Sequence, residues 1–181
     1  MTPTVAFDST ILSLLLFPDA EVQQGGKAVE FAHERVAGLV RELEAGREQV
    51  LVPAPALSEV LVTEGVDVQD VLTTLLGSTF IRIGDFDERA AVELDMRLRA
   101  AIKSGDPRQG MRITKNAMKF DRQIVAIALV NGARVLYSDD NGVQRFASSC
   151  GLATKRVTDL PVPASQPDLF EKLEEPGGED V

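Results

Sequence analysis

Short apolar runs alternate with segments of helical period along this chain of 181 residues. Four runs rich in β-branched or aromatic residues indicate strands, at 4–7, 49–52, 79–83 and 134–137, and a short run at 155–157 is expected to add an edge strand. Strands that are joined through helices pair in parallel by right-handed crossovers, and the helices then cover both faces. The sequence therefore predicts a three-layer α/β/α fold with a parallel sheet of about five strands.

The helical segments carry their own boundary signals. Apolar residues recur at helical spacing over 28–45. Asp67 is placed to cap the helix that follows it, and Asp85 with Glu88 three residues later has the spacing of a capping box. Thr114 is expected to cap the helix that precedes the fourth strand. These signals predict a helix in each interval between strands.

The rare reactive residues exclude several classes of chemistry. The single cysteine, Cys150, rules out an internal disulfide and a thiolate metal cluster, and its apolar neighbours predict a buried position. The only histidine, His33, lies in a polar helical stretch and is expected at a helix surface or boundary. Catalysis by a histidine base and histidine-rich zinc sites are therefore not expected.

No segment has the features of a membrane anchor or a leader. The first ten residues lack a basic stretch, and the apolar run 11–17 is too short to span a bilayer. We expect a cytoplasmic protein that does not enter a membrane.

The net charge of −9 is unevenly distributed. Acidic residues concentrate in a tail at 163–181, which contains proline and glycine and is expected to be disordered, so that 1–162 forms the folded domain. Basic residues crowd one segment: Arg97, Arg99, Lys103, Arg108, Arg112, Lys115, Lys119 and Arg122. This strip suits a phosphodiester substrate, and it equally suits a solvated helix face beside a charged loop.

Acidic residues stand where strands end or the next helix begins. Asp8 follows the first strand, Asp139 and Asp140 follow the fourth, Glu59 lies one turn into the helix after the second, and Asp121 lies on the apolar side of a helix. The carboxyl ends of parallel strands meet at one edge of a sheet, where ligand sites of such folds lie. We therefore expect these acids to converge.

Each acid alone has a structural explanation. Asp8 suits a helix cap, Asp121 an ion pair with Lys115, and Asp140 a turn. Together, with no bases expected beside them, they suit a hard divalent cation, because Mg²⁺ and Mn²⁺ take oxygen ligands and retain several waters. Such a site would hydrolyse a phosphate ester with a metal-activated water and needs no side-chain base.

Four motifs in order resemble the acidic motifs of the PIN domain family. They are VAFDSTILSLLL, PALSEVL, KFDRQIVAIALVNGARVLYSDD and NGVQRFA, and the likeness covers about residues 4–160. PIN domains resemble metal-dependent nucleases, and many bacterial members are VapC toxins of toxin–antitoxin pairs. The resemblance implies a PIN-like fold and an endoribonuclease. The long segment between the first two acids, the basic loop 104–119 and the acidic tail depart from the common core.

The resemblance also implies roles for individual residues. Asp8, Glu59, Asp121 and Asp140 would be catalytic ligands of Mg²⁺ or Mn²⁺, and Ser138 would match the hydroxyl that supports them. Asp139 is adjacent and could take or share the role of Asp140.

Substrate and partners follow from the same resemblance. Arg112, Lys115, Lys119 and Arg122 are candidates for contacts with RNA phosphates. A cognate antitoxin and a second copy of the chain are the protein partners implied, with the apolar stripe at 11–17 serving either the dimer or the core. The alternatives are a non-catalytic PIN-like binding module and a phosphatase of the haloacid-dehalogenase type. The phosphatase would need an aspartate where this chain has Thr10.

Overall fold

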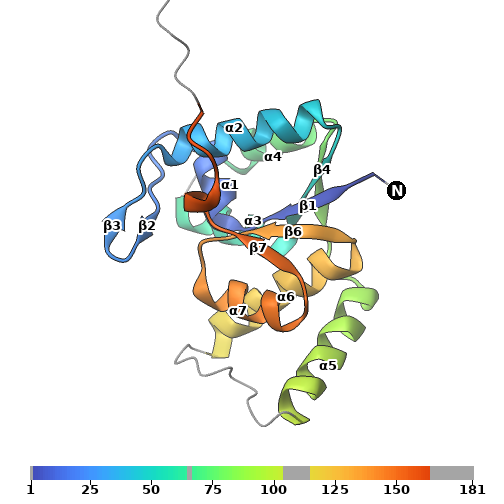
Figure 1. Ribbon diagram of the computed structural model, residues 1–181. Helices are drawn as coiled ribbons and strands as arrows, with labels where there is room; N and C mark the ends of the chain where they lie inside the picture. Colours follow the sequence, from blue (N-terminus) through green and yellow to red (C-terminus); the bar gives the residue numbers. More distant parts are fainter. Residues whose placement is uncertain (1, 65–66, 104–114, 164–181) are drawn as a thin grey trace, which may run out of the picture.

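The computed structural model describes residues 2–64, 67–103 and 115–163 (Figure 1). Its strands are β1 (Thr4–Phe7), β2 (Gln23–Gln24), β3 (Lys27–Ala28), β4 (Gln49–Pro53), β5 (Ile81–Gly84), β6 (Ala133–Tyr137) and β7 (Ala153–Lys155). Its helices are α1 (Ser9–Leu16), α2 (Ala32–Ala45), α3 (Ala54–Glu64), α4 (Val68–Leu76), α5 (Glu88–Lys103), α6 (Lys115–Val130) and α7 (Asn141–Ser149), followed by the 3₁₀ turn η1 (Val157–Asp159).

Five strands form one parallel sheet in the order β5-β4-β1-β6-β7. The first strand lies at its centre, where Val5 is in register with Val50 of β4, and Phe7 with Tyr137 of β6. All four pairings are parallel, so the carboxyl ends of the strands meet at the same edge. The predicted α/β class and strand number are confirmed.

Side chains of the central strands alternate between two separate cores. Val5 and Phe7 of β1 join one core, whereas Ala6 between them joins the other. The neighbouring strands repeat the pattern, with Leu51 and Leu136 on the side of Ala6. A strand that is buried on both faces needs apolar residues at every position, which explains why these runs are continuously apolar.

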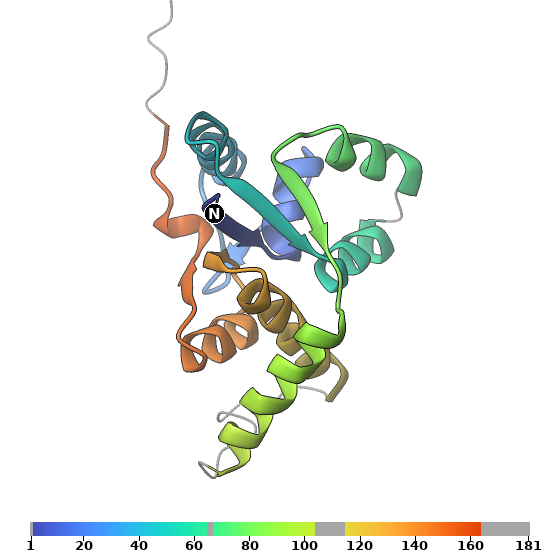
Figure 2. The ribbon, with the colours of Figure 1, turned by 90° about the vertical axis from the view of Figure 1, so that its right-hand side faces the viewer.

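Helices cover both faces and complete the three layers (Figures 1 and 2). The core on one face is made by α1, α2 and α4, and the core on the other by α6 and α7 with the start of α5. Most of α5 extends beyond the sheet (Figure 2). The apolar stripe of α1 is core, because Ile11, Leu12 and Leu14 are buried.

Several predicted boundaries are wrong. The helix expected over 28–45 begins at Ala32, because a two-stranded hairpin of β2 and β3 precedes it and Phe31 takes a left-handed conformation, with φ of 58°. The cap expected at Asp85 is instead Asp87, whose carboxylate accepts a hydrogen bond from the amide of Ala90. Strands three and five are displaced by about two residues from their expected positions.

Some predictions concern residues outside those described. The cap at Thr114, the side chain of Lys115 and residues 164–181 of the acidic tail belong to this group. Where the chain is described, none of its helices combines the length and the apolar character needed to cross a bilayer.

We expect Gly84→Ala to destabilise the fold. A Cβ at Gly84 would lie 2.6 Å from Cδ1 of Leu51 and 2.9 Å from Cγ2 of Ile127, so these buried side chains of β4 and α6 would have to shift. Overpacking of this kind costs about 1–3 kcal/mol, measurable by urea denaturation. Gly46→Ala is the control, because there the nearest atom would lie at 3.3 Å. Equal loss in both variants would contradict the packing explanation.

Candidate metal site

Asp8 is buried at the carboxyl end of β1, with 2% of its surface exposed. One carboxylate oxygen accepts a hydrogen bond from the amide of Ser9 at 2.8 Å, which caps α1. The other accepts one from the hydroxyl of Ser138 at 2.5 Å. Both oxygens are therefore held by groups at the ends of the two central strands, β1 and β6.

Ser138 connects Asp8 to Asp140. Its buried hydroxyl donates to Asp8 and accepts from the amide of Asp140 at 3.1 Å. One oxygen of Asp140 accepts from the amides of Gly142 and Val143 at 2.6 and 2.8 Å, which caps α7. The turn after β6 thus fixes Asp140 beside Asp8, with the hydroxyl between them.

Electrostatic coupling places Asp121 and Glu59 in the same group. The pKa of Asp121 is raised to about 7, mainly by burial and in addition by the charges of Asp140, Asp8 and Glu59. The pKa of Asp8 is raised to about 6. Burial is the largest cause of this raised pKa, the hydrogen bonds from Ser138 and Ser9 oppose it, and the charges of Glu59 and Asp140 add to it. The carboxylates after β1, on α3, on α6 and in the β6–α7 turn are therefore close enough to repel one another electrostatically.

The side chains differ in how far they are exposed to solvent. Asp8 is buried and Asp121 is half-buried, whereas Glu59 and Asp140 are exposed. Glu59 also lines a shallow pocket of about 200 Å³ with Ser9, Thr10 and Glu21. An exposed glutamate on a helix has several staggered rotamers to choose from, so Glu59 can turn toward a ligand.

The donor set suits a hard cation. All donors are carboxylate oxygens, and the like charges raise the pKa of Asp121, so a divalent cation would relieve a repulsion that is already present. Among the described residues, no three acidic, imidazole or thiol groups already stand as a finished cation cage. A cation would therefore have to draw Asp121 and Glu59 toward Asp8 and Asp140, whose carboxylates are held by backbone amides.

Asp139 points away from this group. Its Oδ2 accepts a hydrogen bond from the amide of Val157 at 3.1 Å, and its carbonyl accepts one from Arg156. Burial raises its pKa, and the amide of Val157 and the charge of Arg156 lower it. Its Oδ1 is buried without a hydrogen-bond partner. Of the two adjacent aspartates, the structure brings Asp140 to the other acids and leaves Asp139 at the edge strand.

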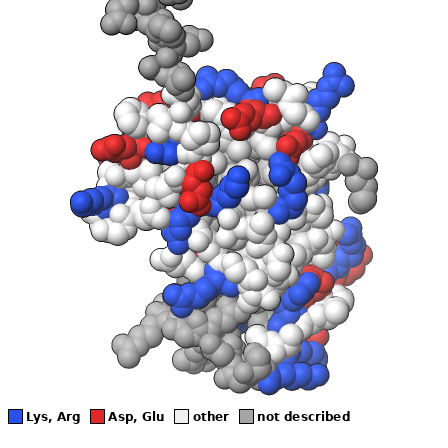
Figure 3. Space-filling view, in the orientation of Figure 1, with Lys and Arg blue, Asp and Glu red and all other residues white. Residues whose placement is uncertain are grey.

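Two arginines of the basic strip form ion pairs on α5. Arg97 pairs with Glu93 and Arg99 with Asp95, one turn apart on α5, so acids and bases intermix over that helix (Figure 3). These two acids lie just before the basic segment.

Two candidates for phosphate contacts remain within the described part of α6. Lys119 is exposed. Arg122 is half-buried with its guanidinium 5.4 Å from the ring centre of Phe146. Arg112 lies outside the described residues, as does the side chain of Lys115.

Gly142 belongs to the site and was not singled out from the sequence. A Cβ there would lie 2.6 Å from Oδ2 of Asp121. The Asn-Gly pair indicated only a turn, because the approach of Asp121 comes from a helix about twenty residues earlier. Nothing in the local pattern signals such a contact.

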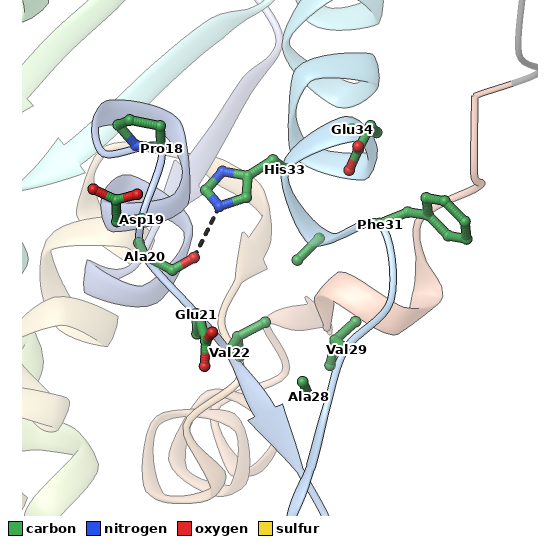
Figure 4. A pocket seen from close by; sticks show the side chains of 11 residues that line it. Pro18, Asp19, Ala20, Glu21, Val22, Ala28, Val29, Phe31, His33 and Glu34 are labelled. Carbon is green, nitrogen blue, oxygen red and sulfur yellow. Dashed lines mark hydrogen bonds between the residues drawn. The ribbon is translucent and has the colours of Figure 1, made fainter.

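A pocket of about 510 Å³ lies apart from the acids, between the loop after α1 and the start of α2 (Figure 4). His33 borders it, and its ring nitrogens lie 2.9 Å from the carbonyl of Leu14 and 2.8 Å from that of Ala20. The histidine therefore attaches this loop to α2, at the boundary position expected. Cys150 is half-buried, not buried as predicted, because it caps the exposed end of α7.

Comparisons with known proteins identify the fold. No family model matches the sequence, and no curated protein matches it significantly. Solved structures do match. A chain of the DNA-bound VapBC structure from Salmonella typhimurium has a TM-score of 0.52 and 14% identity, covering 87% of this chain and 99% of that one. A chain of VapBC2 from Rickettsia felis, bound to a promoter DNA fragment, has 0.54 and 15%, covering 84% and 98%. The PIN-like fold is confirmed.

We expect the metal-free protein to respond to Asp8→Asn in a pH-dependent way. The pKa of Asp8 is about 6 in the folded state against 3.8 for an unperturbed aspartate, so the protonated carboxyl stabilises the fold at low pH and this contribution is lost as pH rises through 6. Asparagine does not ionise. Relative to wild type, the variant should therefore gain about 2 kcal/mol between pH 4 and pH 8 in EDTA.

The measurement is urea denaturation of both proteins at the two pH values. Any hydrogen bond of Asp8 that asparagine does not reproduce would lower the free energy of unfolding of the variant at both pH values. The difference between variant and wild type at pH 4 therefore serves as the control for the difference at pH 8. A difference that does not change with pH would contradict the burial of an ionisable Asp8.

Proposed function

We propose that this chain is a divalent-metal-dependent endoribonuclease, a VapC-like toxin of a toxin–antitoxin pair that acts in the cytoplasm. The observation that carries the proposal is the mutual electrostatic effect of Asp8, Glu59, Asp121 and Asp140 at one edge of the sheet. Such repulsion is costly without a cation, and ligands of parallel sheets bind at this edge. The fold shared with chains of VapBC structures supports the same conclusion.

Each carboxylate has a proposed role. Asp8 and Asp121 are the principal ligands of Mg²⁺ or Mn²⁺, and Glu59 and Asp140 complete the site. Bound there, the ion would supply a hydroxide-like nucleophile and neutralise phosphate charge. Ser138 orients Asp8 by its hydroxyl, as its hydrogen bond indicates. Asp139, which bonds the backbone near η1, has no proposed part in binding the ion.

Basic residues beside the acids would hold the phosphate backbone. Lys119 and Arg122 flank Asp121 on α6, so a strand crossing the site would meet them next to the scissile phosphate. Arg112 and Lys115 precede them in the chain and are proposed to extend the same contact. RNA is the proposed substrate, and single-stranded DNA is the comparison that tests this choice.

Two alternative functions make different predictions. A non-catalytic PIN-like binding module would keep the fold without cation-dependent cleavage; the coupled carboxylates argue against it, because a module gains nothing from clustered like charges. A metal-dependent phosphatase would hydrolyse small phosphate monoesters such as p-nitrophenyl phosphate. Thr10, where that chemistry needs an aspartate, lines the shallow pocket beside Glu59 and offers only a hydroxyl.

Protein partners are part of the proposal. Chains of similar fold come from VapBC structures, so we propose an antitoxin as the cognate partner. We also propose a homodimer. The stripe of α1 gives its buried residues to the core, whereas Val92 and Met96 on α5 are each 60% exposed and lie one turn apart. An extended helix with such a surface is a suitable dimer contact.

Asp8→Asn and Asp121→Asn should each lower Mn²⁺-dependent RNA cleavage by about 100-fold or more, because even groups that only support metal ligands contribute 10–100-fold. EDTA should abolish wild-type cleavage. Asp139→Asn is the matched control and should keep most of the activity. Cleavage is followed on a fluorescent single-stranded RNA, with DNA of the same sequence alongside. Equal activity in all three variants would refute the assignment.

Met96→Asp should convert a dimer into a monomer, because a charge would replace an exposed apolar side chain at the contact. The masses are measured by size-exclusion chromatography with light scattering at micromolar concentration. Val62→Asp is the control, since Val62 is 81% exposed on α3 and should leave the mass unchanged. A monomeric wild-type chain, or a dimer in both variants, would contradict this part of the proposal.

A further inference from the structure

Gly142 is the point where two carboxylates of the site come together. It is buried in the first turn of α7, two residues after Asp140. Its amide donates to Oδ1 of Asp140 at 2.6 Å. A Cβ at this position would lie 2.6 Å from Oδ2 of Asp121 and 2.9 Å from Oδ1 of Asp140. The carboxylates of Asp121 and Asp140 therefore both lie against the space that a side chain at Gly142 would occupy.

The backbone itself gives no reason for a glycine here. The residues with positive φ are elsewhere, and Gly142 lies inside a helix. At such a position alanine is ordinarily preferred, because glycine loses more conformational freedom on folding. What distinguishes this position is that the space a side chain would take is occupied by the carboxylate of Asp121.

The two carboxylates are not equally able to move. Asp140 is fixed by the amides of Gly142 and Val143 as the cap of α7. Oδ2 of Asp121 is the end of a half-buried side chain, so an added methyl group would turn this carboxylate away without moving a backbone. The approach of Asp121 to Asp140 thus depends on the absence of one methyl group.

We infer that Gly142 is a positioning residue for the proposed cation site: its missing side chain lets Asp121 and Asp140 approach closely enough to share one divalent cation. This inference rests on the proposed function. Gly142 has no side chain that could bind an ion. Its role would be to set the distance between two ligands that come from different elements, α6 and the turn after β6.

The test is Gly142→Ala, with Mn²⁺ alone titrated into the full chain and followed by calorimetry. Affinity should fall by about 10–100-fold, the range found when a group that supports metal ligands is removed. The melting temperature in EDTA is measured alongside, because alanine favours the helix whereas its methyl group would also lie 2.9 Å from Oδ1 of Asp140. Gly38→Ala is the matched control, a helical glycine in α2 whose added methyl would meet only Pro163, and its Mn²⁺ affinity should equal that of wild type.

The outcomes separate the inference from the proposed function. Wild-type protein whose Mn²⁺ binding does not depend on Asp8 would refute the metal site, and the inference with it. Binding that depends on Asp8 and is unchanged in Gly142→Ala would refute the inference alone.

A second comparison applies if Gly142→Ala lowers the melting temperature. The same substitution is then made in an Asp121→Ala background, where the clashing oxygen is gone. Recovery of the melting temperature relative to Asp121→Ala would attribute the loss to the contact with Asp121, as inferred. An equal loss in both backgrounds would overturn the inference, because another contact would then be responsible.

Discussion

The burial of Asp8 between two hydrogen-bond donors is the constraint on which the rest of the site depends. Its carboxylate ends the central strand, accepts from the amide that starts α1 and accepts from the hydroxyl of Ser138 across β6. These bonds favour the ionised form, yet burial outweighs them and raises the pKa of Asp8 to about 6. A carboxylate in this balance gains much from a nearby cation. The fold therefore supplies a fixed, partly compensated charge around which Asp121 and Glu59 are arranged.

The sequence predicts the parts of the structure that follow from local rules. Continuous apolar runs and strand–helix alternation identify the sheet, and the acids at strand ends identify the site's edge. Asp8 and Asp140 are both helix caps, so the same residue type at the same place satisfies a local rule and a functional one. That coincidence is why each acid alone was ambiguous. The short hairpin of β2 and β3 was missed because two-residue strands carry no periodicity.

Tertiary packing decides the parts that the sequence did not predict. Asp139 and Asp140 are adjacent residues of the same type, so the sequence alone does not distinguish them. The structure does, because the amide of Val157 in η1 donates a hydrogen bond to Asp139. The basic strip was defined from Arg97 onward, and Glu93 and Asp95 precede it in the chain, each one helical turn from its partner. Arg122 packs over Phe146, a neighbour from another helix. The contacts of Asp139 and Arg122 have no signal in the spacing of residues along the chain, whereas the four-residue spacing of Glu93–Arg97 and Asp95–Arg99 is itself a signal for helix ion pairs.

Fold and site make separate contributions to the functional argument. At 14–15% identity, the likeness to chains of VapBC structures gives the arrangement of strands and helices but not the chemistry. The chemistry rests on how the carboxylates are held, and here the site divides in two. Asp8 and Asp140 are fixed by backbone amides, whereas Asp121 and Glu59 approach from the sides of helices. A cation would have to bring the second pair to the first by turning their side chains, because α3 and α6 are already packed in the core through residues such as Val60 and Ile124.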